Sequence, residues 1–256
     1  MINYMEKNKA FLYARDTNKG NPDTLLKDFR GKYLDYRKKW REQPHMAIEK
    51  KIFGEKFHKS RLIPLCVDIE TAAICDLACP FCYRQWIATP DKLMDEKLAY
   101  SIIRQCSQMG IPSLKLNWRG EPLLHPRLAD FIDFAKKGGI LETIINSNAV
   151  TLNENRSAEL IKSGLDLLIY SFDGGSQKTY EKMRVGRFKT NRFEKVYNNI
   201  RNFAKMRRKM NSPFPRTKIQ MILTEETFDE QDSFFDMFRD YVDDISVKAY
   251  SERGGQ

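Results

Sequence analysis

The chain has 256 residues, of which 41% are hydrophobic, and its formal net charge at pH 7 is +10. This length and composition are typical of one large globular domain with an extension. No apolar run approaches the ~20 residues of a transmembrane helix, and the N-terminus lacks the apolar segment of a signal peptide. Five cysteines, an odd number with three close together, argue against a disulfide framework and predict a reducing, cytoplasmic location.

The first part of the chain is more basic than the rest. Residues 1–60 carry 15 Lys and Arg against 8 Asp and Glu. An apolar stripe at helical spacing predicts an amphipathic helix over residues 22–41. The stripe consists of Leu25, Phe29, Tyr33, Tyr36 and Trp40. Residues 42–61 are polar without clear periodicity, and we predict a linker there. A basic extension suits nucleic acid, an acidic peptide or plain solvation, and no nucleic-acid motif accompanies it.

Residues 61–250 alternate between strand-like and helix-like patterns. Strands are predicted at 65–72, 113–118, 142–147, 166–172, 217–223 and 244–250. Helices are predicted near 95–109, 127–137, 154–163, 190–209 and 228–242. This alternation predicts an α/β domain with a parallel sheet and right-handed crossovers. The tail, 251–256, follows the last strand directly, so the chain is either a minimal core or truncated before a C-terminal domain.

Three cysteines, Cys75, Cys79 and Cys82, stand in the loop after the first predicted strand. Their C-x3-C-x2-C spacing suits three thiolates that hold three irons of a [4Fe–4S] cube and leave the fourth iron open. The alternative is zinc, which needs a fourth ligand, and none of the three histidines stands at the spacing of a zinc knuckle. The spacing therefore favours a cluster with one open iron.

This loop, with Phe81 before its last cysteine, resembles the signature of radical S-adenosylmethionine (radical SAM) enzymes. The resemblance covers residues 62–250, and its further motifs are most similar to the SPASM-type group of peptide-modifying and sulfatase-maturing enzymes. It implies a partial TIM barrel, (β/α)6, here with an α-helical N-terminal extension. It also implies one three-cysteine [4Fe–4S] cluster and SAM at the open iron.

The same resemblance implies an activity and its partners. The expected reaction is reductive cleavage of SAM to a 5′-deoxyadenosyl radical, which takes a hydrogen atom from the substrate. An external reductant such as flavodoxin or ferredoxin is expected, with a peptide, another macromolecule or a small molecule as substrate. Two alternatives stay open: a non-catalytic iron–sulfur or zinc protein that assists nucleic-acid binding, and a radical SAM enzyme that acts on RNA. The reaction after hydrogen abstraction is not specified by these motifs.

Peptides at later strand ends extend the resemblance. Gly120 and Glu121 stand in a Gly-Glu-Pro that resembles the family's G-G-E-P element, which holds the ammonium group of SAM, and Arg119 replaces the first glycine. Asn148 stands where relatives carry Thr-Asn-Gly, and Ala149 replaces that glycine. Parallel-barrel sites form at the carboxyl ends of strands, so these peptides are expected beside the cysteines.

The fourth predicted strand ends in Ser-Phe-Asp-Gly, which resembles another element of the same group. The resemblance implies that Ser171, and Arg184 of a Tyr-x-x-x-Arg segment, contact the carboxylate or ribose of SAM. Thr224 and Leu223, at the end of the fifth predicted strand, are expected to line the adenosine pocket. The full set of predicted cofactor contacts is Phe81, Gly120, Glu121, Asn148, Ser171, Asp173, Arg184 and Thr224.

Overall fold

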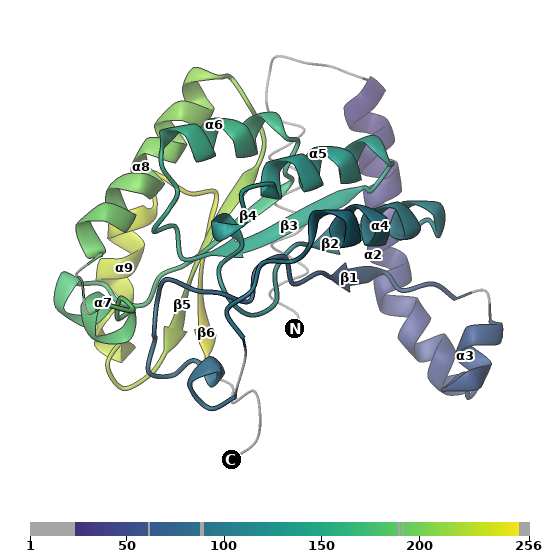
Figure 1. Ribbon diagram of the computed structural model, residues 1–256, viewed down its shortest axis with the longest axis horizontal. Helices are drawn as coiled ribbons and strands as arrows, with labels where there is room; N and C mark the ends of the chain where they lie inside the picture. The colour runs from purple at the N-terminus through teal and green to yellow at the C-terminus, as the bar shows by residue number, and fades with distance from the viewer. Residues whose placement is uncertain (1–23, 61, 88–89, 189, 191, 251–256) are drawn as a thin grey trace.

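Six parallel strands form one sheet, and they are hydrogen-bonded in chain order from β1 to β6. The computed structural model describes residues 24–60, 62–87, 90–188, 190 and 192–250. The strands are β1 (Cys66–Asp68), β2 (Ser113–Lys115), β3 (Glu142–Ser147), β4 (Leu167–Ser171), β5 (Arg216–Leu223) and β6 (Asp244–Ala249). Figure 1 shows the strands fanning through the molecule beneath a layer of helices. The predicted α/β partial barrel is confirmed.

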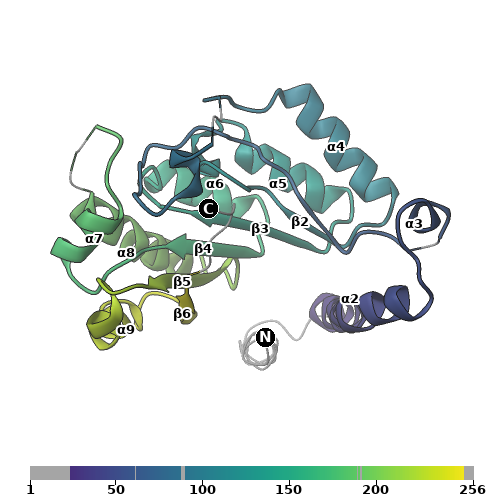
Figure 2. The same ribbon diagram turned by 90° about the horizontal axis from the view of Figure 1, so that it is seen from below.

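Helices connect successive strands, and they cover the outer face of the sheet. They are α4 (Glu96–Gln108), α5 (Leu128–Lys137), α6 (Glu154–Lys162), α7 (Gln177–Met183), α8 (Phe193–Lys209) and α9 (Gln231–Phe238). The helix starts of α4 and α6 are capped, because Asp95 accepts a hydrogen bond from Leu98 and Asn153 accepts one from Arg156. Figure 2 shows α4, α5 and α6 on one face of the sheet and the N-terminal helix α2 (Thr24–Glu49) on the opposite side. In the described part of the chain, no helix has the length and apolar character to cross a bilayer.

Aromatic side chains form the core of the C-terminal half. Phe172, which follows β4, is fully buried, and its ring centroid lies 4.2 Å from that of Tyr180 and 4.8 Å from that of Phe238. Such pairs add to the free energy gained by burying the rings. Because Phe172 is sandwiched between α7 and α9, the residues on either side of it are held in fixed positions at the end of β4.

The N-terminal helix packs against the amino end of the sheet. Tyr33 and Tyr36 are 2% and 4% exposed, and they contact Leu65 and Leu141, which precede β1 and β3. Trp40, of the same predicted stripe, is 42% exposed. The side chains of Leu25 and Phe29, the first two predicted helix residues and the tail 251–256 lie outside the described part. At least part of the stripe is therefore structural, and the division of the chain at residue 60 remains a prediction.

The predicted linker over residues 42–61 is wrong in its first half and near its end. Helix α2 continues to Glu49, and a further short helix, α3 (Glu55–Lys59), follows. Ion pairs one helical turn apart stabilise these polar segments, such as Lys38–Glu42 and Lys59–Glu55. Helix α7 was also not predicted, because seven residues are too few to show a clear periodicity.

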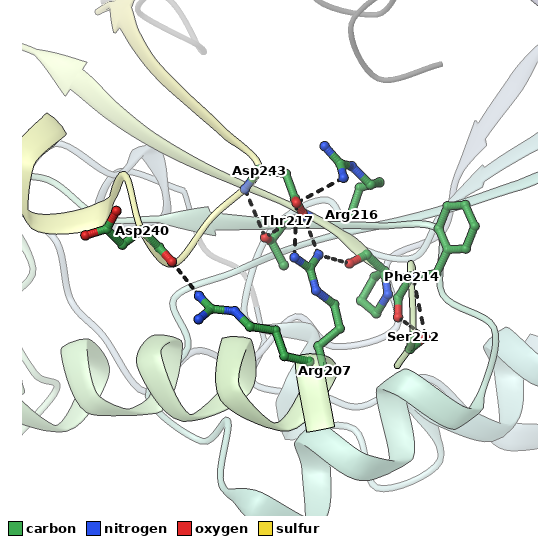
Figure 3. Close-up of polar contacts among 9 residues, drawn as sticks. Arg207, Ser212, Phe214, Arg216, Thr217, Asp240 and Asp243 are labelled. Atoms are coloured by element: carbon green, nitrogen blue, oxygen red, sulfur yellow. Dashed lines mark hydrogen bonds and ion pairs between the residues drawn. The ribbon is translucent and has the colours of Figure 1, made fainter. Parts of the chain in front are cut away.

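A buried carboxylate joins the amino ends of β5 and β6 to α8. Asp243 Oδ2 accepts a hydrogen bond from the backbone N–H of Thr217 at 2.7 Å, and the guanidinium groups of Arg207 and Arg216 both contact its carboxylate (Figure 3). Burial alone would raise the pKa of Asp243, but the hydrogen bonds and charge of Arg207 lower it below its ordinary value. One carboxylate thus fixes three elements at the bottom of the barrel.

We predict that Asp243→Asn destabilises the protein by about 1.5–3 kcal/mol, because the partly buried guanidinium of Arg207 loses its charged hydrogen-bond acceptor. Because the folded pKa is lowered, the contribution of Asp243 is complete above the ordinary Asp pKa and is lost as the pH falls through the folded pKa. Asp236→Asn is the matched control, since its ion pair with Arg239 is 69% exposed. Urea unfolding near neutral pH measures both variants, and equal stability of the two would contradict the prediction.

Candidate cofactor site at the carboxyl ends of the strands

The loop that carries the three cysteines is held by a segment far later in the chain. The backbone N–H of Ala78 donates to the carbonyl of Val185 at 2.8 Å, and that of Arg187 donates to the carbonyl of Asp76 at 3.0 Å. A bridge between Leu77 and Gly186 completes this pairing. The loop after β1 is therefore a fixed part of the barrel rim, although it has little regular structure of its own.

The three thiols line the wall of one cavity of about 1010 Å³. The backbone N–H of Leu77 lies 3.5 Å from Cys75 Sγ, and Asn148 Nδ2 lies 3.8 Å from it. On the second cysteine, Arg184 Nη1 lies 3.9 Å from Cys79 Sγ. These donors stabilise negative charge on sulfur, which is the form that binds iron.

Burial opposes that charge in the protein alone. It raises the pKa of Cys75 to about 12, with a further increase from the nearby Glu121, and it raises the pKa of Cys79 as well. Metal binding deprotonates thiols and releases their protons. The free energy needed to ionise the buried thiols therefore lowers the net free energy gained when the cluster assembles. Three thiols on one wall, with N–H donors and a guanidinium beside them, are a donor set that suits a [4Fe–4S] cluster. As they stand, the described residues form no group of three or more ligating side chains close enough to hold one metal ion.

The loop after β2 approaches the cysteine segment so closely that it requires glycine. Gly120 has a φ of 61°, and a Cβ atom there would lie 2.2 Å from the carbonyl oxygen of Ala72 and 2.6 Å from that of Ile74. The backbone N–H of the next residue, Glu121, donates to the same Ile74 carbonyl at 2.8 Å. The Gly-Glu step thus sits directly against the backbone that leads to Cys75.

Arg119, which replaces the first glycine of the family element, is bound to β1's continuation. Its Nε and Nη2 atoms lie 2.7 and 2.6 Å from the two carboxylate oxygens of Glu70. Its guanidinium also lies 4.7 Å from the ring centroid of Trp118. The bidentate pair is one reason that this loop tolerates arginine in place of glycine.

Glu121 ties the second strand end to the third. Its Oε1 accepts hydrogen bonds from Leu123 N–H and Ser147 Oγ, and its Oε2 accepts one from Asn148 N–H at 2.7 Å. Burial raises the pKa of Glu121 to about 7, although these hydrogen bonds act in the opposite direction. Asn148 in turn donates to Asp76 Oδ1 at 2.7 Å, which connects the third strand end to the cysteine loop.

The fourth strand end holds Arg184 in place. Asp173 is fully buried; its Oδ2 accepts from Arg184 Nε at 2.6 Å, and its Oδ1 accepts from the backbone N–H of Ile222 at 2.6 Å. The guanidinium of Arg184 lies 5.5 Å from the ring centroid of Phe81. Arg184 lines the cavity and Asp173 does not. Asp173 therefore contributes to the site by holding the guanidinium of Arg184 in position.

Most of the predicted site residues meet around this one cavity. Its wall includes Cys75, Cys79, Phe81, Cys82, Gly120, Glu121, Asn148, Ser171 and Arg184. Thr224 and Leu223 are not among the described residues that line this wall, and their contact with adenosine stays a prediction. Strand β5 ends at Leu223, and Thr224 turns away in a tight turn in which its N–H donates to Thr227 Oγ1 at 2.9 Å.

Sequence reasoning missed the inward-facing residues inside the strands. Lys115, Asn146, Lys218 and Gln220 line the cavity below the strand ends. Side chains alternate between the two faces of a strand, so Lys218 and Gln220, which are two residues apart on β5, share a face.

Comparison with known proteins identifies the family. The model of the radical SAM superfamily matches residues 69–238, and the chain belongs to that superfamily. Its membership confirms the predicted [4Fe–4S] cluster and SAM as cofactors. A probable GTP 3′,8-cyclase of Methanothermobacter marburgensis is 28% identical over 123 residues, which are 48% of this chain and 39% of that protein.

Solved structures agree with the fold. The crystal structure of Streptococcus suis SuiB bound to S-adenosylmethionine matches 90% of this chain and 54% of that chain, with a TM-score of 0.62 and 19% identity. The structure of anSMEcpe with bound AdoMet matches 76% of this chain and 55% of that chain, with a TM-score of 0.60 and 17% identity. At these identities the likeness concerns the fold alone. The chain spans well under two thirds of each of these proteins.

We predict that Gly120→Ala destabilises the protein by at least about 2 kcal/mol, because the new Cβ meets two backbone carbonyls in a left-handed conformation. Gly31→Ala is the control: a Cβ atom added to this exposed glycine of α2 would have no neighbour within 4 Å, and the variant should gain about 0.5–1 kcal/mol. Thermal or urea unfolding checks both changes. A Gly120→Ala protein as stable as wild type would contradict the prediction.

Proposed function

We propose that this chain is the catalytic core of a radical SAM enzyme, with SAM bound at the iron that Cys75, Cys79 and Cys82 leave open. When bound, the reduced cluster supplies the electron that cleaves SAM and yields a 5′-deoxyadenosyl radical, which takes a hydrogen atom from the substrate. The observation that carries the proposal is the shared wall: the three cysteines and the later strand-end residues line one cavity.

The protein itself holds and orients the cofactors and shields the radical from water. Glu121 fixes the Asn148 loop, and Asp173 fixes Arg184 beside the second cysteine. Phe81 and the partly buried Tyr83 contribute apolar surface to the same wall, which limits the access of water to a reactive radical. Burial of this kind also strengthens charge-assisted contacts with a bound cofactor.

For SAM itself, we assign Gly120 and Glu121 to the ammonium group. Ser171 and Arg184 are assigned to the carboxylate or ribose. Arg184 supports this assignment, because its planar guanidinium suits a carboxylate and lines the cavity. Glu121 would contribute through its carboxyl group or through the backbone that it positions, since its oxygens already accept three protein hydrogen bonds.

An external one-electron donor such as flavodoxin or ferredoxin belongs to the proposal, as does a peptide or small-molecule substrate. A related fold, SuiB, has a solved structure with its precursor peptide SuiA, which supports a peptide for that protein. A cytoplasmic location is also proposed, supported by the five cysteines, which are all free.

We expect the anaerobically reconstituted protein to hold about four irons and four sulfides per chain and to form 5′-deoxyadenosine when dithionite and SAM are added. Cys79→Ala should lose the cluster and the SAM cleavage together. Cys106→Ala is the control, because Cys106 is buried among apolar side chains of α4. Bound zinc in place of iron, or an intact cluster in Cys79→Ala, would refute the assignment.

The SAM contacts are tested separately from the cluster. Ser171→Ala, Glu121→Gln and Arg184→Lys should keep their iron while SAM binds about 10- to 100-fold more weakly, the cost of one charge-assisted contact. Arg239→Ala, on the exposed face of α9, is the control. Equilibrium binding of SAM to the reconstituted proteins provides the measurement. Unchanged affinity in all three variants would overturn these assignments.

A further inference from the structure

The cavity that holds the three cysteines has a basic wall. Among the described residues that line it, Glu121 is the single carboxylic acid, and its oxygens are occupied by protein donors. The basic side chains on the wall are Arg84, Lys115, Arg119, Arg184, Lys218 and Lys248. The volume, about 1010 Å³, lies at the upper end of the ~300–1,000 Å³ that one drug-sized ligand occupies. The surroundings of this cavity favour a ligand that carries negative charge.

The arginines on this wall are held by carboxylates behind it. Arg119 pairs with Glu70 at 2.6 Å and Arg184 with Asp173 at 2.5 Å. Arg84 pairs with Asp91 at 3.1 Å. The three lysines differ, because they stand on strands and not in loops: Lys115 ends β2, Lys218 lies within β5, and the exposed Lys248 lies in β6. The lysines are therefore distinct from the three arginines, which hold the loops of the rim.

The two inner lysines, Lys115 and Lys218, are in different electrostatic states. Lys218 is 7% exposed, and its Nζ lies 2.7 Å from Asp244 Oδ2, so its charge is compensated. Lys115 is only partly buried, and no carboxylate of the described residues lies within ion-pair distance of its ammonium group. Lys115 therefore brings a net positive charge to the cavity.

The strand register places these lysines deeper than the SAM assignments. Ser171 is paired with Gln220, and Lys218 is two residues before Gln220 on β5. On the other side, Lys115 is paired with Ile144 on β3. Lys115 and Lys218 stand on β2 and β5, which are three steps apart in the sheet, and both line the same cavity.

Near Lys218, two polar atoms have no hydrogen-bond partner among the described residues. Asn146 Oδ1 and Gln220 Oε1 are buried without a hydrogen bond, and both residues line the cavity. A buried acceptor without a donor lowers stability unless a ligand satisfies it. Asn146 is one strand from Ile169, whose partner is Lys218. Acceptors and cations thus share one region of the inner wall.

We propose that Lys115 and Lys218, with Asn146 and Gln220, form a substrate subsite for a phosphate or carboxylate group on a skeleton that carries hydroxyl or amine donors. Lys115 supplies the uncompensated charge that binds the anion. Lys218, whose charge Asp244 compensates, donates a hydrogen bond to it, and the two amide oxygens accept from the donors. Ile144 and Ile169 are inward-facing neighbours that would contact the carbon skeleton. This inference rests on the proposed function, because it places the substrate next to SAM.

The test is calorimetric titration of the reconstituted, SAM-loaded protein at constant ionic strength. The probes are ribose 5-phosphate for the phosphate, gluconate for the carboxylate and ribose as the neutral control. Wild type should bind at least one of the two anions and not ribose, and the anion that binds identifies the group. Lys115→Met should bind it about 10- to 100-fold more weakly. Lys115→Arg, which keeps the charge, should bind it nearly as well as wild type.

Lys97→Met is the matched control, because Lys97 is exposed on α4 away from the cavity. Iron content and SAM affinity of Lys115→Met, unchanged from wild type, show that its fold and cofactor site are intact. The inference is overturned if wild type binds neither anion, or if Lys115→Met binds them as tightly as wild type does. Anion binding is measured without turnover. Failure of the protein to cleave SAM would refute the proposed function, and the anion titration could still be interpreted.

Discussion

The cysteine loop depends on hydrogen bonds to a segment that comes more than a hundred residues later in the chain. Ala78 pairs with Val185, and Arg187 pairs with Asp76, so the loop is shaped by tertiary contacts. That constraint sets the position of Arg184, the residue just before the segment, whose guanidinium faces Cys79. A partial barrel can meet this requirement because all of its strand ends open onto one rim.

Buried carboxylates connect the pieces of that rim. Glu121 joins the second strand end to the third, and Asp173 joins Arg184 to the backbone of β5. A buried charge is costly unless it is paired and hydrogen-bonded, and both carboxylates have such partners. Each carboxylate accepts hydrogen bonds from groups on different strand ends, so each one holds more than one loop in place. The site is in this sense one network, with the cysteines at its centre.

Much of this arrangement was predictable from the sequence, since alternating periodicity predicts the barrel and the cysteine spacing predicts the cluster. What escaped prediction depends on contacts between distant segments. The hydrogen bonds that hold the cysteine loop join residues more than a hundred positions apart, and no local pattern reports them. Likewise Lys115 and Lys218 look like ordinary strand residues until the register places both on the inner face. The helical end of α2 was missed because residues 42–49 show no clear apolar stripe; Gln43 in this segment donates a hydrogen bond to the carbonyl of Ile63.

The central claim is that three cysteines hold a cluster and leave one iron for SAM. Mössbauer spectroscopy of protein reconstituted with iron-57, recorded with and without SAM, tests it most directly. The account predicts that SAM changes the spectrum of the one iron that no cysteine holds, while the signals of the other irons keep their parameters. A spectrum that SAM leaves unchanged, or one in which every iron has four sulfur ligands throughout, would contradict it.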